Sequence, residues 1–233
     1  MATTDKKDKK TSTTPKEEES DSTQPDPLLA DFPIVFNMNE PPPEPKEKIR
    51  TIGLYGTIKE EVCSEIVYSL MVLDKVGKII TPKDPDNPKS KEIISYEPIE
   101  LVISSYGGSA ADMFSVYDTM RDVRDRCEIE TMGLGKVMSA AVLLLAAGTK
   151  GKRKIGRHCR VMIHGVISGQ HGHISDLENE MEEAKWTQGQ YIKALAKETS
   201  MTQKYIKTLI DKKMNVYLTA QEAVDLGIAD IIV

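Results

Sequence analysis

Short runs of β-branched residues alternate along this chain with longer segments of helical periodicity. The clearest run is Leu101-Val102-Ile103, and the clearest helical pattern has apolar residues at 62, 66, 67, 70 and 73. This alternation is typical of an α/β fold in which helices connect the strands. We expect strands at 51–54, 99–104, 128–132, 160–163 and 228–233, and helices at 60–76, 110–124, 138–148, 174–199, 202–212 and 219–226.

The region before this alternation has a different composition. Residues 1–27 are dominated by Ser, Thr, Lys, Glu, Asp and Pro and contain no aromatic residue, which predicts a disordered polar tail. Residues 28–48 combine a brief apolar patch with a proline-rich linker, so we expect the folded domain to span 49–233. Within it, residues 77–98 are rich in proline and charge, and Ile93 and Ile94 indicate an extra hairpin arm.

Composition narrows the class of protein. The chain has 233 residues, 39% of them hydrophobic, which is enough for one domain with a real core. A net charge of −5 argues against binding to nucleic acid, because no basic field is present to neutralise phosphates. The one basic cluster, at 150–154, is expected to be a solvated turn after a helix.

The three cysteines are far apart and have no CxxC spacing, so neither a disulfide framework nor a zinc site is expected. His171 and His173 lack a cysteine or carboxylate at matching spacing, and we expect no metal there. The sequence shows no signal-peptide pattern and no apolar run that could span a membrane. These features predict a soluble protein of a reducing cytoplasm.

Ser139 follows a glycine-containing turn, Gly135 to Met138, at the start of an apolar helix, where we expect it in the first helical turn. A serine there can expose its hydroxyl beside free backbone N–H groups, as an acyl-transfer nucleophile requires. Capping the helix is the commoner role of serine at such a place.

His164 ends the apolar strand 160–163, and the helix and strand are close in sequence, so the two side chains can come within reach of one another. Gly107-Gly108 follows another strand, either as a tight turn or as amides that face an oxyanion.

Together these segments resemble the Clp protease proteolytic subunit family, in the right order and over about residues 49–233. The matching stretches are Ser104-Ser105-Tyr106-Gly107-Gly108-Ser109, Val116 to Met120, Gly135 to Ser139, Leu143 to Arg153, Arg160-Val161-Met162-Ile163-His164, Leu218 to Ala223 and Leu226-Gly227.

The resemblance implies a crotonase-like α/β fold with a head domain and a projecting handle helix, here about 174–199. It implies a serine endopeptidase with Ser139 as nucleophile and His164 as base, oxyanion amides from Gly108 and Ala140, and no cofactor. An extended peptide would pair with backbone around three further residues: Ser109, Ala110 and Ile167. The handle's apolar positions, 177, 181, 184, 192 and 195, suit a helix that buries one face against a partner.

The family's partners follow from the same resemblance. Seven subunits form a ring, two rings stack around a chamber, and an AAA+ unfoldase of Clp type, which consumes the ATP, supplies unfolded polypeptides. No nucleic acid or membrane is expected as a partner.

The chain departs from the family at the third catalytic position, where Asn215 stands in place of aspartate. An asparagine can accept the Nδ1–H of the histidine but cannot stabilise an imidazolium by charge. Lys213-Met214 replaces an Asp-Arg pair used between rings, Tyr106 replaces a proline, and the usual N-terminal pore loop has no counterpart.

Three functions therefore remain open: an active peptidase subunit, a catalytically weak structural subunit of a mixed ring, and, less favoured, a crotonase-fold acyl-CoA enzyme.

Overall fold

The computed structural model describes residues 49–87, 89–169, 171–212 and 215–233. The expected polar tail at 1–27 and the apolar patch with its linker at 28–48 lie outside the described residues, as do Lys213 and Met214. In chain order the elements are β1 (Thr51–Ile58), α1 (Glu60–Val76), β2 (Lys78–Pro82), β3 (Glu92–Tyr96), β4 (Ile99–Gly108), α2 (Ala110–Arg124), β5 (Ile129–Met138), α3 (Ala140–Ala146), β6 (Arg153–Ile155), β7 (Arg160–Ile163), α4 (Ile174–Glu198), α5 (Gln203–Asp211), β8 (Val216–Leu218), α6 (Ala220–Asp225) and β9 (Ile231–Ile232).

Seven of these strands form one mostly parallel sheet, which confirms the expected α/β class. The order is β1-β4-β5-β6-β9, and β7 pairs with β5 on one side and β8 on the other. Within this sheet only β7 and β8 are antiparallel. Strand β5 pairs with β6 over its first half, at Thr131 to Gly133, and with β7 over its second half, at Lys136 to Met138. This change of partner brings the end of β7 beside the end of β5.

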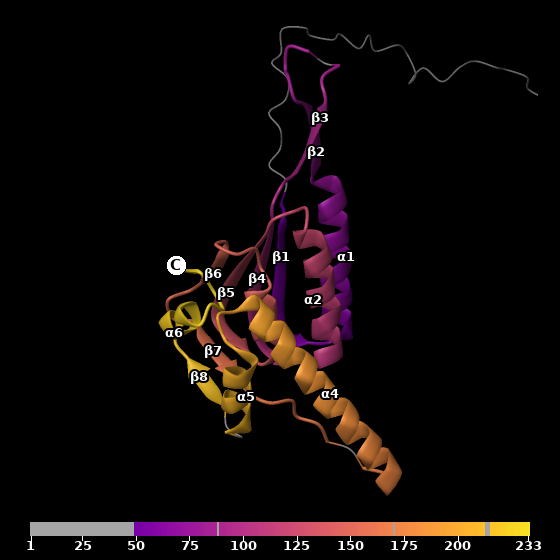
Figure 1. The fold of residues 1–233 in the computed structure, drawn as a ribbon, viewed down its shortest axis with the longest axis vertical. Helices are drawn as coiled ribbons and strands as arrows, with labels where there is room; N and C mark the ends of the chain where they lie inside the picture. The colour runs from indigo at the N-terminus through magenta and orange to yellow at the C-terminus, as the bar shows by residue number, and fades with distance from the viewer. Residues whose placement is uncertain (1–48, 88, 170, 213–214) are drawn as a thin grey trace, which may run out of the picture. The chain divides into compact units, whose positions relative to one another are not determined.

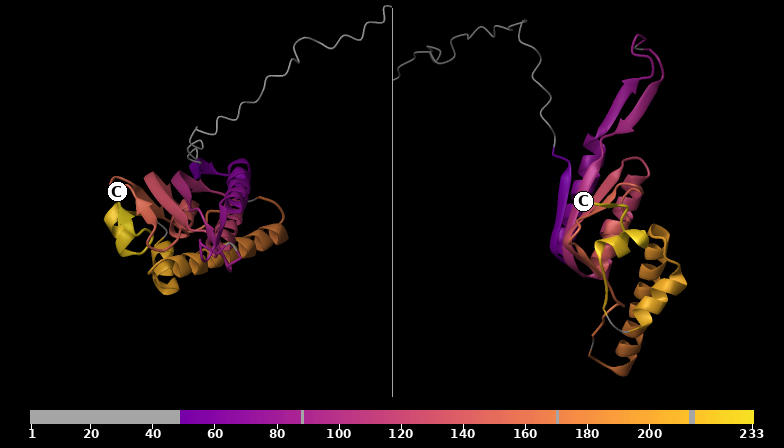
Figure 2. Two further views of the ribbon diagram at one scale, coloured as in Figure 1. Left: turned by 90° about the horizontal axis from the view of Figure 1, so that it is seen from above. Right: turned by 90° about the vertical axis from the view of Figure 1, so that its left-hand side faces the viewer.

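Helices cover one face of the sheet, with α1 and α2 side by side along β1 and β4 (Figures 1 and 2). Alternate residues of β4 point into the core, and Ile99, Leu101 and Ile103 are fully buried. All seven residues of α3 are buried, so this short apolar helix lies inside the domain. None of the described helices has the length and apolar character needed to cross a membrane.

Strands β2 and β3 form the expected hairpin arm, which projects from the sheet (Figure 1). Among the described residues these two strands pair only with each other. A backbone hydrogen bond of 2.9 Å from Glu97 to Gly77 closes the base of the arm. Its isoleucines, including Ile80 and Ile94, are about half exposed.

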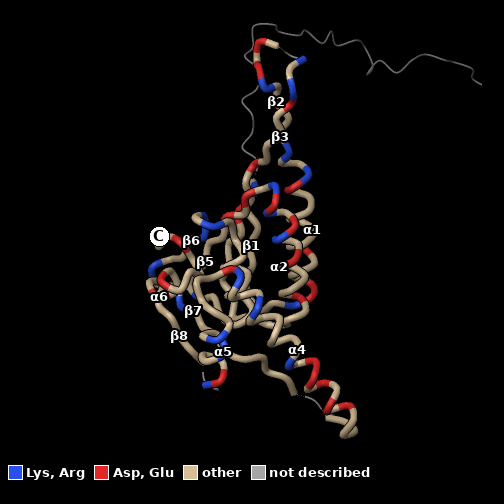
Figure 3. Tube along the Cα trace, in the orientation of Figure 1, with Lys and Arg blue, Asp and Glu red and all other residues tan. Residues whose placement is uncertain are grey.

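Helix α4 has two different halves. The second half packs on the domain through Tyr191, Ile192 and Leu195, whereas the first half extends beyond it (Figure 1). Leu177 and Met181 are exposed there, and most of the acidic residues of the helix gather on the same half (Figure 3). The prediction of one partner-facing apolar stripe was therefore wrong for the second half, whose apolar residues belong to the chain's own core.

Several element ends differ from the sequence predictions. Strands β4 and β5 were expected to end at 104 and 132 but extend to Gly108 and Met138. The glycines after the predicted ends continue the strands and do not terminate them. The strands β6 and β8, of three residues each, were not predicted. The basic run at 150–154 is only partly a solvated turn, since Arg153 lies in β6, is 3% exposed and pairs with Asp230.

Candidate active site

Ser139 lies between a strand and a helix, not in the first helical turn as the sequence suggested. It follows β5 directly and is the N-cap of α3, but its side chain makes no capping hydrogen bond. Its φ of 56° makes it the only non-glycine residue with positive φ in the described part of the chain. A side chain held in that region is strained and is typical of functional turns, such as the strand-to-helix elbow that exposes a nucleophile.

Two backbone contacts fix this turn. The Ser139 N–H donates to the Met162 carbonyl of β7 at 2.8 Å, and the Ser139 carbonyl accepts from the Tyr191 hydroxyl of α4 at 3.2 Å. Burial raises the pKa of that hydroxyl, which keeps it protonated as a donor. Strand β7 and helix α4 thus clamp the serine from two sides.

Gly107 and Gly108 end β4 against the same turn, and both have positive φ. A Cβ on Gly107 would lie 2.6 Å from the Ser139 Cβ, and a Cβ on Gly108 would lie 2.1 Å from the Ile58 carbonyl oxygen. Only glycine allows these close approaches. Ala140 is the first residue of α3, so its backbone N–H has no partner within the helix and is available to an oxyanion.

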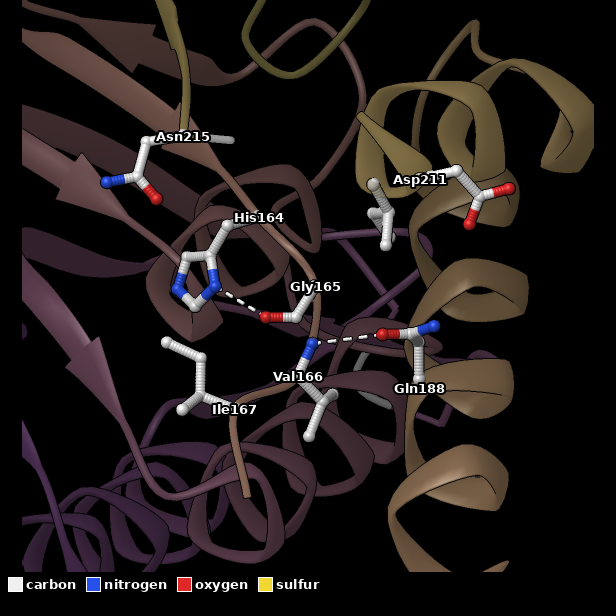
Figure 4. A pocket seen from close by; sticks show the side chains of 8 residues that line it. His164, Gly165, Val166, Ile167, Gln188, Asp211 and Asn215 are labelled. Carbon is white, nitrogen blue, oxygen red and sulfur yellow. Dashed lines mark hydrogen bonds between the residues drawn. The ribbon is translucent and has the colours of Figure 1, made fainter. Parts of the chain in front are cut away.

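His164 follows the last residue of β7 and is partly buried. Its Nδ1 lies 2.5 Å from the Gly165 carbonyl oxygen, which is an acceptor only (Figure 4). Nδ1 must therefore carry the proton of the neutral ring, and Nε2 keeps its lone pair. That is the tautomer a general base needs.

One groove of about 460 Å³ gathers seven of the eight residues proposed from the sequence. No hydrogen bond joins Ser139 to His164 among the described residues, although both line this groove. The seven residues are Ser139, His164, Gly108, Ala140, Ser109, Ala110 and Ile167.

Ser109 does not offer a free backbone donor to a peptide. Its N–H donates to the Ile58 carbonyl at 2.9 Å, and its side chain accepts from the Asp112 N–H as the N-cap of α2. Ile167, which lines the same groove, is 83% exposed.

Asn215 lies in a neighbouring pocket, also of about 460 Å³, that shares His164 and Ile167 with the groove. Its side chain lies on the His164 side of this pocket, whereas the carboxylate of Asp211 points away from the ring (Figure 4). No hydrogen bond joins Asn215 to His164 within the described structure. The Gly165 carbonyl takes the position on Nδ1 that the resemblance gave to Asn215.

Helix α4 contributes two residues that the sequence did not single out. Tyr191 holds the carbonyl of Ser139, and Gln188 accepts the Val166 N–H at 3.1 Å and so positions the segment after His164 (Figure 4). The only signal in the sequence was their spacing of three on a predicted helix, which places them on one face.

Residues 91–233 match the model of the Clp protease family. The chain is 33% identical over 183 residues to ATP-dependent Clp protease proteolytic subunit 1 of Prochlorococcus marinus, covering 78% of this chain and 83% of that protein. It is 35% identical over 182 residues to the protein of the same name from Corynebacterium glutamicum, covering 78% and 77%. It is 34% identical over 182 residues to ATP-dependent Clp protease proteolytic subunit 2 of Corynebacterium jeikeium, covering 78% of this chain and 77% of that protein.

Proposed function

The chain belongs to the Clp protease family, and we propose that it is a serine endopeptidase, the proteolytic subunit of a Clp-type ATP-dependent protease. The observation that carries this proposal is the strained Ser139 turn, which shares one groove with His164. A structural serine has no need of positive φ, because capping a helix requires only extended backbone.

In the proposed reaction, the Ser139 hydroxyl attacks a peptide carbonyl while His164 Nε2 accepts its proton. The backbone N–H groups of Gly108 and Ala140 stabilise the oxyanion, and His164 returns the proton to the leaving amine. Water then attacks the acyl-enzyme as His164 accepts its proton, and His164 returns that proton to the Ser139 oxygen when the acyl bond breaks. Asn215 is the proposed third member, which competes with the Gly165 carbonyl for Nδ1–H.

The test of this assignment is covalent labelling with a fluorophosphonate. The parent protein should label, and Ser139→Ala should lose labelling while keeping its circular dichroism spectrum, because alanine fits the apolar start of α3. Thr57→Val is the matched control, since it removes a hydroxyl from the same groove but no nucleophile. Labelling that persists in Ser139→Ala would exclude Ser139 as the nucleophile.

We extend the proposal to the assembly. The chain forms heptameric rings, stacked in pairs, around a chamber supplied with unfolded polypeptide by an AAA+ unfoldase of Clp type in the cytoplasm. That partner consumes the ATP, and this chain needs no cofactor. In this crotonase-like arrangement, α4 is the handle and the rest of the domain is the head.

The exposed half of α4 supports self-association. Ile174, Leu177 and Met181 fall on one face of it and are exposed, although a helix rarely leaves such a stripe in water. Charged substitutions at Leu177 and Met181 should lower the particle mass in light scattering. An equal charge added at Asn179 is the control, and an unchanged mass in the double variant would place the interface elsewhere.

A second candidate is a catalytically weak structural subunit that joins active relatives in a mixed ring. Asn215 favours it, because an amide offers no charge to the imidazolium that forms during attack. The labelling experiment separates the two: a structural subunit should assemble but label no faster than its Ser139→Ala variant.

A further inference from the structure

Two cations lie side by side on the face of the sheet that the helices leave open. Lys136 of β5 and Arg160 of β7 are partners in the parallel register, so their side chains point to the same side. Like charges at facing positions of neighbouring strands destabilise a sheet. The repulsion between Lys136 and Arg160 therefore destabilises the sheet. The groups around the two side chains should show what compensates for this repulsion.

The other outward-facing lysines of this region have acidic partners. Lys152 pairs with Glu128 and Glu130, and Lys154 pairs with Glu130 at 2.7 Å. Lys136 and Arg160, by contrast, form no salt bridge within the described part of the chain. The sheet thus pairs the cations beside β6 with carboxylates and leaves the two beside Ser139 without them.

Each of these two cations lies over a tyrosine ring instead. The Lys136 ammonium is 4.7 Å from the centre of the Tyr106 ring, and the Arg160 guanidinium is 6.0 Å from that of Tyr217. The row across β4, β5, β7 and β8 is therefore tyrosine, lysine, arginine and tyrosine. Tyr106 is 67% exposed and Tyr217 is 50% exposed, so the row is open to solvent.

One acid acts on Arg160 from a distance. The pKa of Glu222 on α6 is lowered mainly by its hydrogen bonds to the Thr219 backbone and side chain, and to a small extent by the charge of Arg160. Its carboxylate completes the capping box of α6, with bonds to Thr219 of 2.7 and 2.8 Å. It forms no salt bridge with Arg160 among the described residues, so the guanidinium has no carboxylate in direct contact there.

The row adjoins the candidate active site. Tyr106 lines the groove that contains Ser139. Lys136 lies on β5 three residues before Ser139, which follows the strand, so the two residues are at most about 10 Å apart at about 3.3 Å per residue. An extended peptide covers that distance in about three residues. The row is therefore within reach of side chains that flank a scissile bond held at Ser139.

We propose that Tyr106, Lys136, Arg160 and Tyr217 form a subsite for carboxylate side chains of the polypeptide substrate, within about three residues of the scissile bond. A carboxylate between the two cations would relieve their repulsion and form charge-assisted hydrogen bonds, and the tyrosine rings would pack against the peptide. This inference rests on the proposed peptidase function, and it names the class of substrate that the groove favours.

The test uses full-length Ser139→Ala protein, so that binding is measured without cleavage. Two fluorescently labelled decapeptides are compared by anisotropy, one with Asp and Glu on both flanks of its central residue and one with Asn and Gln instead. The acidic peptide should bind about fivefold more tightly, the size expected for a partly exposed charged contact. Added salt should reduce the difference.

Lys136→Gln and Arg160→Gln, each added to Ser139→Ala, should bring the two affinities within about twofold of each other. Lys75→Gln, which removes the same charge from exposed helix surface, should leave the preference intact. Equal binding of the two peptides before either substitution, or a preference that survives both, overturns the subsite. If neither peptide binds, both the subsite and the groove as a peptide-binding site are overturned. The catalytic proposal is tested separately, by fluorophosphonate labelling of the parent protein.

Discussion

Gly107 and Ser139 are in such close contact that a Cβ on the glycine would lie 2.6 Å from the Cβ of the serine. It would also lie 2.8 Å from the Met138 carbonyl oxygen, which is backbone and cannot rotate away. The end of β4 therefore sets the position of the candidate nucleophile as directly as β5, the strand that immediately precedes Ser139.

Gly107→Ala should displace the Ser139 turn and slow fluorophosphonate labelling more than tenfold, because a shift of about 1 Å costs about 10²-fold in such sites. The strain at a φ of 96° should also lower the free energy of unfolding by about 1–3 kcal/mol. Gly151→Ala is the control, since Gly151 has a φ of 82° and an added Cβ there would meet nothing within 4 Å. It should lose stability but not labelling, and equal labelling losses in both variants would contradict the argument.

Glu198 should make stability depend on pH. This carboxylate is 1% exposed and accepts from Tyr117, Arg121 and Arg124 at 2.9 to 3.2 Å. Burial alone would raise its pKa, but the hydrogen bonds and charge of Arg124 and the other donors bring it below its ordinary value of 4.5.

The folded protein therefore binds the Glu198 proton more weakly than the unfolded chain does. Its stabilisation is complete above the unfolded pKa and is lost as the pH falls through the lower folded pKa. Glu198→Gln should cost about 3 kcal/mol at neutral pH, and the cost should shrink in acid. Denaturant unfolding at several pH values measures this, with the exposed Glu178→Gln as control. A cost that did not change with pH would show that hydrogen bonding, not charge, is what matters at Glu198.

The hairpin arm should be dispensable for folding. Its strands pair only with each other in the described structure, and the Glu97–Gly77 bond closes its base. Replacing residues 79–95 with a short Gly-Ser turn should shift Tm by no more than about 2 °C. Tyr96→Ala should lower Tm more, because this side chain packs partly buried against the core. A larger loss on deleting the arm would mean that the domain depends on it.

The sequence predicted the long helices well for a physical reason. Helices α1 and α2 begin and end at the predicted residues. In both, apolar periodicity over about four turns agrees with local signals such as the Ser109 N-cap of α2. Strands β6 and β8 have three residues each, too few for a period-two pattern to emerge. Their pairing depends on β5 and β7, which local sequence does not encode.

The candidate site was predictable in composition but not in geometry. The closeness in sequence of the Ser139 helix and the His164 strand indicated their packing, and the bond from the Ser139 N–H to Met162 provides it. The positive φ of Ser139 was not predictable, because it arises where β4, β7 and α4 meet around one residue. The Gly165 carbonyl on Nδ1 was missed for a similar reason, since backbone acceptors leave no mark in the sequence.

Asn215→Asp tests the mechanism most directly. An aspartate beside His164 would offset the positive charge that grows on the ring during attack, and it would compete with the Gly165 carbonyl for Nδ1–H. The reverse change, from aspartate to asparagine, lowers turnover about 10⁴-fold in a serine protease with a complete triad, or roughly 5–6 kcal/mol of transition-state stabilisation. We expect a smaller gain here, because Gly165 already holds the tautomer that a base requires.

The parent should therefore hydrolyse a short fluorogenic peptide slowly, and Asn215→Asp should raise kcat more than it changes KM, because the added charge acts mainly in the transition state. Asn179→Asp adds the same charge on the exposed part of α4 and should have no effect. Particle mass is measured alongside, so that a change in assembly is not mistaken for catalysis. If Asn215→Asp assembles normally and is no faster than the parent, the Gly165 carbonyl suffices to orient His164, and Asn215 has no part in the reaction.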